Sequence, residues 1–188
     1  MAKSSSPEKT TQPALIATCQ EESGLKPVVL STRTGRPILN GQSDAISLFE
    51  WHQIGDIQRR FPPGPLLQYV NGTCPLYNCH GLTFASRRTT IGPEDSLIPT
   101  ILKDDGYEEI QKANTQPGDL ILYLNPEDNE VEHSGIVVKV VESPLGSPVP
   151  HVWSKWGKGP EAIHHFGECP YSPENVQFFR LRKWQQTK

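Results

Sequence analysis

The sequence predicts an α+β domain in which N-terminal helices pack on an antiparallel β-sheet, because helical patterns come first along the chain and strand patterns come later. From residue 43 to residue 106, apolar side chains recur at helical spacing between helix start and stop signals. From residue 119 onward, the apolar residues form the short or alternating runs that are typical of strands. A length of 188 residues favours a single domain.

Three segments carry helix signals. Ser43 is a candidate N-cap for a helix that runs toward Arg60, and Gly55 in its middle leaves two shorter helices as an alternative. The stripe expected to face the core consists of Ile46, Phe49, Ile57 and Phe61. A short helix is predicted over Cys79 to Arg88, with two arginines in its last turn. A third starts at Pro93 and stops at residues 104–106.

Four segments are predicted as strands, namely residues 119–124, 134–141, 151–156 and 176–181. The first is apolar on both faces, which indicates a central buried strand. Residues 27–40 are rich in β-formers and are broken by Thr34-Gly35, which predicts a hairpin or an extended arm.

The chain is expected to divide into a disordered tail, residues 1–13, and one domain, residues 14–188. Within this domain, residues 14–70 form an N-terminal arm and helix, and residues 71–188 form the core. The arm is a candidate lid, buttress or docking site for a protein partner.

Composition narrows the function class. A net charge of −3 argues against a nucleic-acid binder with a broad basic face. No apolar run approaches the roughly 18 residues of a membrane span. The first 12 residues lack the apolar region of a signal peptide, so we expect a cytoplasmic protein, or one exported by a signal-independent route. The four cysteines are therefore expected to be thiols.

Cys79 and His133 are the candidate catalytic pair. Cys79 stands where a loop turns into a helix, and a helix N-terminus favours the thiolate, so its pKa is expected to fall from about 8.5 toward about 7 or lower. The backbone N–H at Cys79 is a candidate donor to an oxyanion. His133 opens a predicted strand, where an imidazole can serve as the base. The alternative is an ordinary buried cysteine and a loop histidine.

Three short motifs carry a family resemblance. Residues 78–82 (Asn-Cys-His-Gly-Leu) resemble the nucleophile motif of the NlpC-like branch of the papain-fold cysteine peptidases. Residues 117–121 (Pro-Gly-Asp-Leu-Ile) and 132–137 (Glu-His-Ser-Gly-Ile-Val) resemble two later strand motifs of that family, in the same order. Asn78 and His80 depart from the family's usual Asp and Ser. The resemblance covers roughly residues 78–156.

This resemblance implies a papain-like fold and a cysteine hydrolase of the peptidase or amidase class, which needs no cofactor and acts on a peptide or protein amide. It implies that Cys79 attacks, that His133 moves the proton, and that a third residue orients His133. The aligned third position is Ser154, with His151 and His165 as fallback candidates. Deamidation and acyl transfer would use the same residues. With no signal peptide, a cytosolic enzyme or an exported bacterial effector is expected rather than a cell-wall enzyme.

Further polar and aromatic residues are candidates for substrate binding. The substrate-binding candidates are Tyr77, Trp153, Lys155 and Trp156. The alternative is that the aromatic rings pack in the core and the lysine is solvated.

Two other function classes stay open. One is a catalytically inactive papain-like binding module. The other is a small zinc-stabilised interaction protein, using Cys74, Cys79 and His80 or the His164-His165 pair with Cys169. Neither cluster has the tight Cys-x2-Cys spacing, so no metal is expected.

Overall fold

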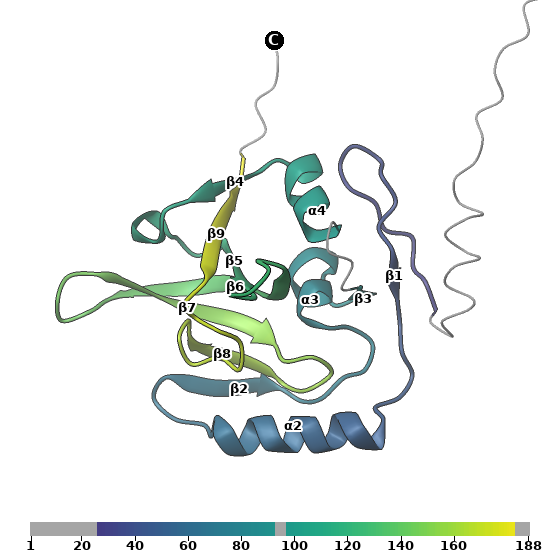
Figure 1. The fold of residues 1–188 in the computed structure, drawn as a ribbon, viewed down its shortest axis with the longest axis horizontal. Coiled ribbons are helices and arrows are strands. Elements are labelled where there is room, and N and C mark those ends of the chain that lie inside the picture. Colours follow the sequence, from purple (N-terminus) through teal and green to yellow (C-terminus); the bar gives the residue numbers. More distant parts are fainter. Residues whose placement is uncertain (1–25, 93–96, 183–188) are drawn as a thin grey trace, which may run out of the picture.

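The computed structural model describes residues 26–92 and 97–182. These residues form three α-helices and a seven-stranded antiparallel sheet with the strand order β2-β8-β7-β6-β5-β9-β4 (Figure 1). The prediction of an α+β fold with helices on an antiparallel sheet is confirmed. The predicted tail at residues 1–13 lies outside the described residues.

The helices are α2 (Leu48–Arg60), α3 (Cys79–Ala85) and α4 (Leu97–Asp105). The strands of the large sheet are β2 (Leu67–Asn71), β4 (Tyr107–Ile110), β5 (Leu120–Leu124), β6 (Val131–Glu142), β7 (Pro148–Lys155), β8 (Glu161–His165) and β9 (Val176–Leu181). A two-stranded sheet joins β1 (Asn40–Gly41) to β3 (Thr90–Ile91), and a single 3-10 turn, η1, covers Lys112–Asn114.

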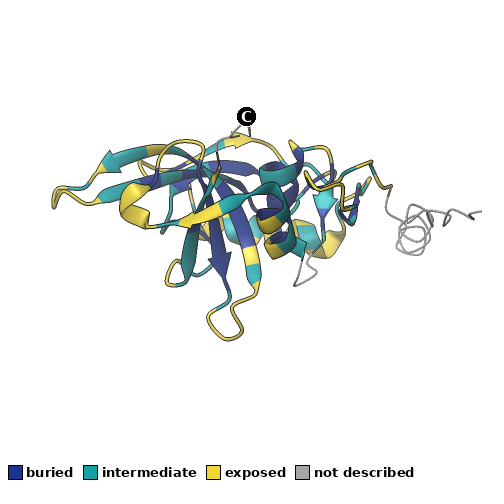
Figure 2. Ribbon diagram, turned by 90° about the horizontal axis from the view of Figure 1, so that it is seen from above, coloured by how far each residue is buried: buried dark blue, intermediate teal, exposed yellow. Residues whose placement is uncertain are grey.

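Strand β5 shows why the core has two sides. All five of its residues are buried, as predicted. Leu120, Leu122 and Leu124 pack with α3, α4 and the N-terminal arm, whereas Ile121 and Tyr123 join a second cluster on the opposite face. Strand alternation thus buries both faces of the central strands (Figure 2).

Helix α2 corrects the predicted N-cap and part of the predicted apolar stripe, of which Ile57 and Phe61 pack against the core as predicted. Ser47, not Ser43, is the N-cap, and it forms a capping box with Glu50. The helix runs unbroken through Gly55. Ile54 is its buried residue, while Phe49 is 71% exposed, because the helix contacts the rest of the protein on one side along the β2 edge of the sheet (Figure 1).

Helix α3 is shorter than predicted. It ends at Ala85, because Ser86 and Arg87 adopt positive φ angles of 50° and 65°. Arg87 therefore leaves the helix and pairs with Glu161 on β8. Helix α4 ends before Gly106, as predicted, but its predicted start at Pro93 lies outside the described residues.

The predicted arm is present as an extended hairpin-like segment with a turn at Thr34 and isolated bridges at Ser31↔Pro37 and Lys26↔Gln42. Three strands of the large sheet were not predicted, namely β2, β4 and β8. No helix in the described part of the chain is long and apolar enough to cross a membrane.

Candidate functional site

Cys79 is the first residue of α3, at the place where this helix meets the sheet. Asn78 is the N-cap, and its side-chain oxygen accepts hydrogen bonds from the N–H groups of Gly81 and Ile91 at 2.9 and 3.2 Å. Its amide nitrogen donates to the carbonyl of Ile91 at 2.8 Å. One side chain thus caps the helix and attaches it to β3.

This double role makes Asn78 a test of how the nucleophile candidate is held. We expect Asn78→Ala to lower the free energy of unfolding by about 1–2 kcal/mol, because the helix loses its cap and β3 loses a partner. Ser47→Ala removes the N-cap of α2 and is the matched control. Both losses are measurable by urea denaturation.

Only Asn78→Ala should also change the rate at which Cys79 is alkylated by iodoacetamide. Equal alkylation rates in both variants would show that the cap does not position the thiol.

Strand β6 has only one neighbouring strand where it passes the start of α3. The pairing of β6 with β7 starts at Gly135↔Ser154, whereas the first residues of β6 pair only with β5, through Tyr123↔His133 and Leu122↔Ser134. Ser134 faces α3, since its hydroxyl lies 2.9 Å from His80 Nδ1 and donates to Thr83 at 3.0 Å. Strand alternation turns His133 toward the other face.

Burial raises the pKa of the Cys79 thiol to about 11, with backbone hydrogen bonds at Ser134 and the charge of Lys155 acting in the opposite direction. The side chain is only 4% exposed. The predicted decrease in the pKa is therefore wrong for this conformation, because desolvation of the thiolate outweighs the helix terminus and the nearby donors. Cys79 is a neutral thiol at rest.

His133 is completely buried, and neither of its ring nitrogens has a hydrogen-bond partner among the described residues. Burial lowers its pKa well below the ordinary value, and the neighbouring His164 and His80 lower it further. The imidazole is therefore neutral and able to accept a proton. It is the third residue of β6 rather than the residue that opens the strand.

Tyr171 connects the two candidates. Its ring stacks on His133 with the centroids 4.1 Å apart and the planes 7° from parallel. Tyr171 also forms part of the wall of a cavity of about 300 Å³, together with Cys79, His80 and residues 130–132. No hydrogen bond joins Cys79 to His133 in the described part of the chain. Tyr171, which sequence reasoning did not single out, thus contacts His133 and also lines the cavity of Cys79.

Ser154 does not orient His133 in this structure, which corrects the predicted third residue. Its hydroxyl lies 2.8 Å from Nε2 of His164, and Nδ1 of His164 lies 2.8 Å from the His165 carbonyl. Because a carbonyl only accepts, Nδ1 carries the proton and Nε2 accepts from Ser154. The fallback candidates His151 and His165 contact one another instead, with centroids 6.2 Å apart.

Three predicted substrate-binding residues belong instead to a network around Glu161. The Glu161 carboxylate accepts hydrogen bonds from Tyr77 at 2.6 Å and from Trp153 at 2.9 Å, and it pairs with Arg87 at 2.7 Å. Burial alone would raise the pKa of Glu161, but Arg87, Tyr77 and Asn71 lower it to about 2. Lys155 is fully buried, donates to the Gly159 carbonyl at 2.5 Å and lies over the Tyr77 ring.

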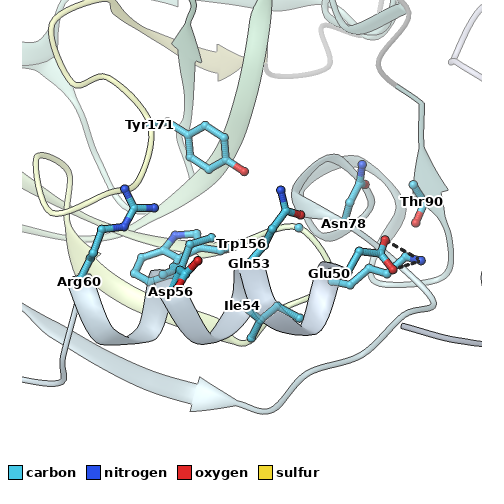
Figure 3. Close-up of a pocket in the computed structure, with 12 residues that line it drawn as sticks. Glu50, Gln53, Ile54, Asp56, Arg60, Asn78, Thr90, Trp156 and Tyr171 are labelled. Atoms are coloured by element: carbon cyan, nitrogen blue, oxygen red, sulfur yellow. Dashed lines mark hydrogen bonds and ion pairs between the residues drawn. The ribbon is translucent and has the colours of Figure 1, made fainter. Parts of the chain in front are cut away.

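The fourth predicted residue, Trp156, lines a second cavity of about 520 Å³ between α2 and the loop that follows β7. Figure 3 shows Trp156, Arg60 and Gln53 around one hollow, with Tyr171 across from them. Asn78, Gly157 and Tyr171 line both cavities, so this space adjoins the cavity of Cys79. Arg60, Tyr171 and Glu161 had no motif in the sequence that could have identified them.

The zinc alternative lacks a ligand set in residues 26–92 and 97–182, where no three His, Cys, Asp or Glu side chains converge. Cys74, Cys79 and Cys169 are free thiols.

Comparison of the chain with protein-family models, with curated proteins and with solved structures found no match.

Proposed function

We propose that the protein is a cysteine hydrolase with a papain-like arrangement, which cleaves an amide bond through an acyl-enzyme on Cys79 with His133 as the base. The observation that carries the proposal is the unpartnered imidazole of His133, buried beside the tyrosine that lines the Cys79 cavity. Leaving a buried polar group without a partner costs about 1–3 kcal/mol, and a catalytic role is one reason to keep such a group.

The chemistry follows from the neutral resting state of both groups. The Cys79 sulfur attacks the carbonyl carbon while His133 takes the thiol proton, and His133 returns that proton to the leaving nitrogen as the C–N bond breaks. Water then attacks the thioester with the same histidine as the base. This transfer requires Tyr171 to move away from His133, because the imidazole is turned to the face of the sheet opposite α3 and the Tyr171 ring covers it in the resting state.

The test is acylation by a panel of activated esters and thioesters, read by the intact mass of the protein. We expect one acyl adduct, lost in Cys79→Ala and retained in Cys169→Ala. Cys169 is a matched control, because burial raises the pKa of its thiol as well, to about 12. His133→Gln should slow acylation by about 100-fold or more, the usual contribution of a general base. His151→Gln should not.

The pH profile adds a second readout. Since the pKa of His133 lies well below its ordinary value, acylation should stay constant as the pH falls through 6.5 and decline only at lower pH. A rate unaffected by His133→Gln, or an adduct that survives Cys79→Ala, would contradict the hydrolase. Absence of any adduct from the folded protein favours the binding-module alternative.

A further inference from the structure

The cavity of about 520 Å³ beside α2 has the size of a ligand site, within the usual range of roughly 300–1,000 Å³. It meets the Cys79 cavity along Asn78, Gly157 and Tyr171. A chain bound in this space therefore lies next to the cavity of Cys79.

The negative charges in its wall are already paired. Glu50 forms an ion pair with Lys158 at 3.0 Å and also accepts from the backbone N–H of Ser47. Asp56 forms an ion pair with Arg59, one turn along α2. Neither carboxylate is therefore free to attract a cation.

Two donors in the wall, those of Arg60 and Trp156, have no partner within the described residues, unlike Lys158, which is paired with Glu50. Arg60 lines the cavity and forms no ion pair within the described residues, unlike its neighbour Arg59. Trp156 is 1% exposed, and its indole N–H has no hydrogen-bond partner in residues 26–92 and 97–182. In Figure 3 the nitrogen edge of the Trp156 ring lies on the side of Arg60 and Tyr171, but the nitrogen itself is buried, so an acceptor in the cavity contacts it only after a neighbouring side chain shifts. An indole N–H can only donate, so this site takes an acceptor.

Part of the wall is apolar, beside the polar side chains of Gln53, Asn78 and Thr90. Ile54, Ile57 and the Trp156 ring lie along this apolar part, and these suit an aliphatic stem. An acceptor with negative charge on a short aliphatic stem describes the side chain of an acidic amino acid.

We propose that this cavity binds an acidic peptide segment, with a side-chain carboxylate held by Arg60 and by the indole N–H of Trp156. As a statement about the substrate of Cys79, this rests on the proposed hydrolase. As a statement about binding, it stands on the paired carboxylates and the unpaired donors alone.

The experiment measures binding to the Cys79→Ala protein by calorimetry, with two capped tripeptides as probes. One is acetyl-Ala-Glu-Ala-amide and the other is acetyl-Ala-Gln-Ala-amide, which has nearly the same shape without the charge. We expect the glutamate peptide to bind about fivefold more tightly, as for one partly exposed ion pair. Trp156→Phe should weaken both peptides, because it removes a donor that serves either one.

Variants that remove a positive or a negative charge from the cavity wall should change the preference for the glutamate peptide in opposite directions. Arg60→Gln should abolish the preference, Arg60→Lys should keep most of it, and Asp56→Asn should increase it by removing a nearby negative charge. Arg33→Gln, on the distant arm, makes the same change in net charge and should leave the preference unchanged. Equal binding of the two peptides, no binding at millimolar concentration, or a preference that survives Arg60→Gln would overturn the proposal.

Because peptide binding is measured on the Cys79→Ala protein, which cannot be acylated, the hydrolase proposal and the acidic-peptide proposal can be rejected independently. Acylation of Cys79 with no peptide preference would reject the acidic segment alone. A preference that depends on Arg60, with no acylation of Cys79, would reject the hydrolase alone.

Discussion

The free energy of unfolding should fall steeply as the pH is lowered from about 6.5 to about 4. Three buried histidines, His80, His133 and His164, cause this loss. Burial lowers the pKa of His80 and of His164 to about 4, and it lowers the pKa of His133 well below its ordinary value. The unfolded chain binds protons at these imidazoles near pH 6.5, whereas the folded protein does not.

The sign follows from proton linkage. Where the unfolded state binds more protons, stability rises with pH, so stability is lost as the pH falls below the unfolded pKa and stops falling below the folded pKa. His80 and His164 should each contribute about 3 kcal/mol to this loss. Glu161, whose pKa is lowered to about 2, adds a further loss of stability below about pH 4.5. In this range the unfolded chain binds a proton at Glu161, whereas the folded protein keeps the carboxylate charged and paired with Arg87.

Urea denaturation at pH 7, 5.5 and 4.5 measures the effect. His80→Gln should flatten the dependence on pH, although it also removes the contact with Ser134. His52→Gln, on the exposed surface of α2, is the control and should leave the slope unchanged. A free energy of unfolding that stays constant between pH 7 and pH 4.5 would show that the buried imidazoles are protonated in the folded protein.

Gly81→Ala should destabilise the protein by about 3 kcal/mol or more, at the upper end for overpacking. An added Cβ would lie 1.8 Å from the backbone oxygen of Thr89 and 3.0 Å from Cβ of Tyr77. Alanine is the better helix former by about 1 kcal/mol, so the clash must outweigh a favourable change in propensity. To relieve it, α3 must move away from Thr89, and Cys79 moves with it.

Gly55→Ala is the matched control, since Gly55 also lies inside a helix. There the nearest atom to an added Cβ is the flexible end of Arg59, at 3.4 Å. We therefore expect Gly55→Ala to stabilise the protein by about 0.5–1 kcal/mol and to leave the reactivity of Cys79 unchanged. Thermal unfolding and iodoacetamide labelling measure both effects. The same sign of change in both variants would contradict the close approach of α3 to Thr89.

The resting state of the candidate site differs from the one that the sequence indicated. A cysteine at a helix start was expected to be a thiolate, yet burial keeps Cys79 neutral. The difference has a physical cause, because the helix terminus is a local feature, whereas desolvation depends on side chains such as Tyr171 that come from distant segments. An ordered sequence of substrate entry, Tyr171 displacement and proton transfer follows from the proposed function.

The elements that the sequence predicted well have strong local signals. Strand β5 is apolar at every position, and α4 ends at Asp105, directly before Gly106. One error lies between two local signals, and another arises where a local signal competes with a contact from elsewhere. Ser43 and Ser47 both suit an N-cap, but only Ser47 has a glutamate three residues later to complete a capping box. Arg87 was placed in a helix, but the buried Glu161 binds it outside the helix.

Sequence by itself determined the α+β class, the central strand, and the placement of Cys79 at a helix start and of His133 in the strand that α3 contacts. These follow from periodicity and capping, which act over a few residues. Only the tertiary structure decided that Ser154 binds His164, that Tyr77 and Trp153 bind Glu161, and that Tyr171 stacks on His133 beside the Cys79 cavity. Such contacts join residues far apart in the chain, and no local pattern encodes which of several polar groups will share one buried space.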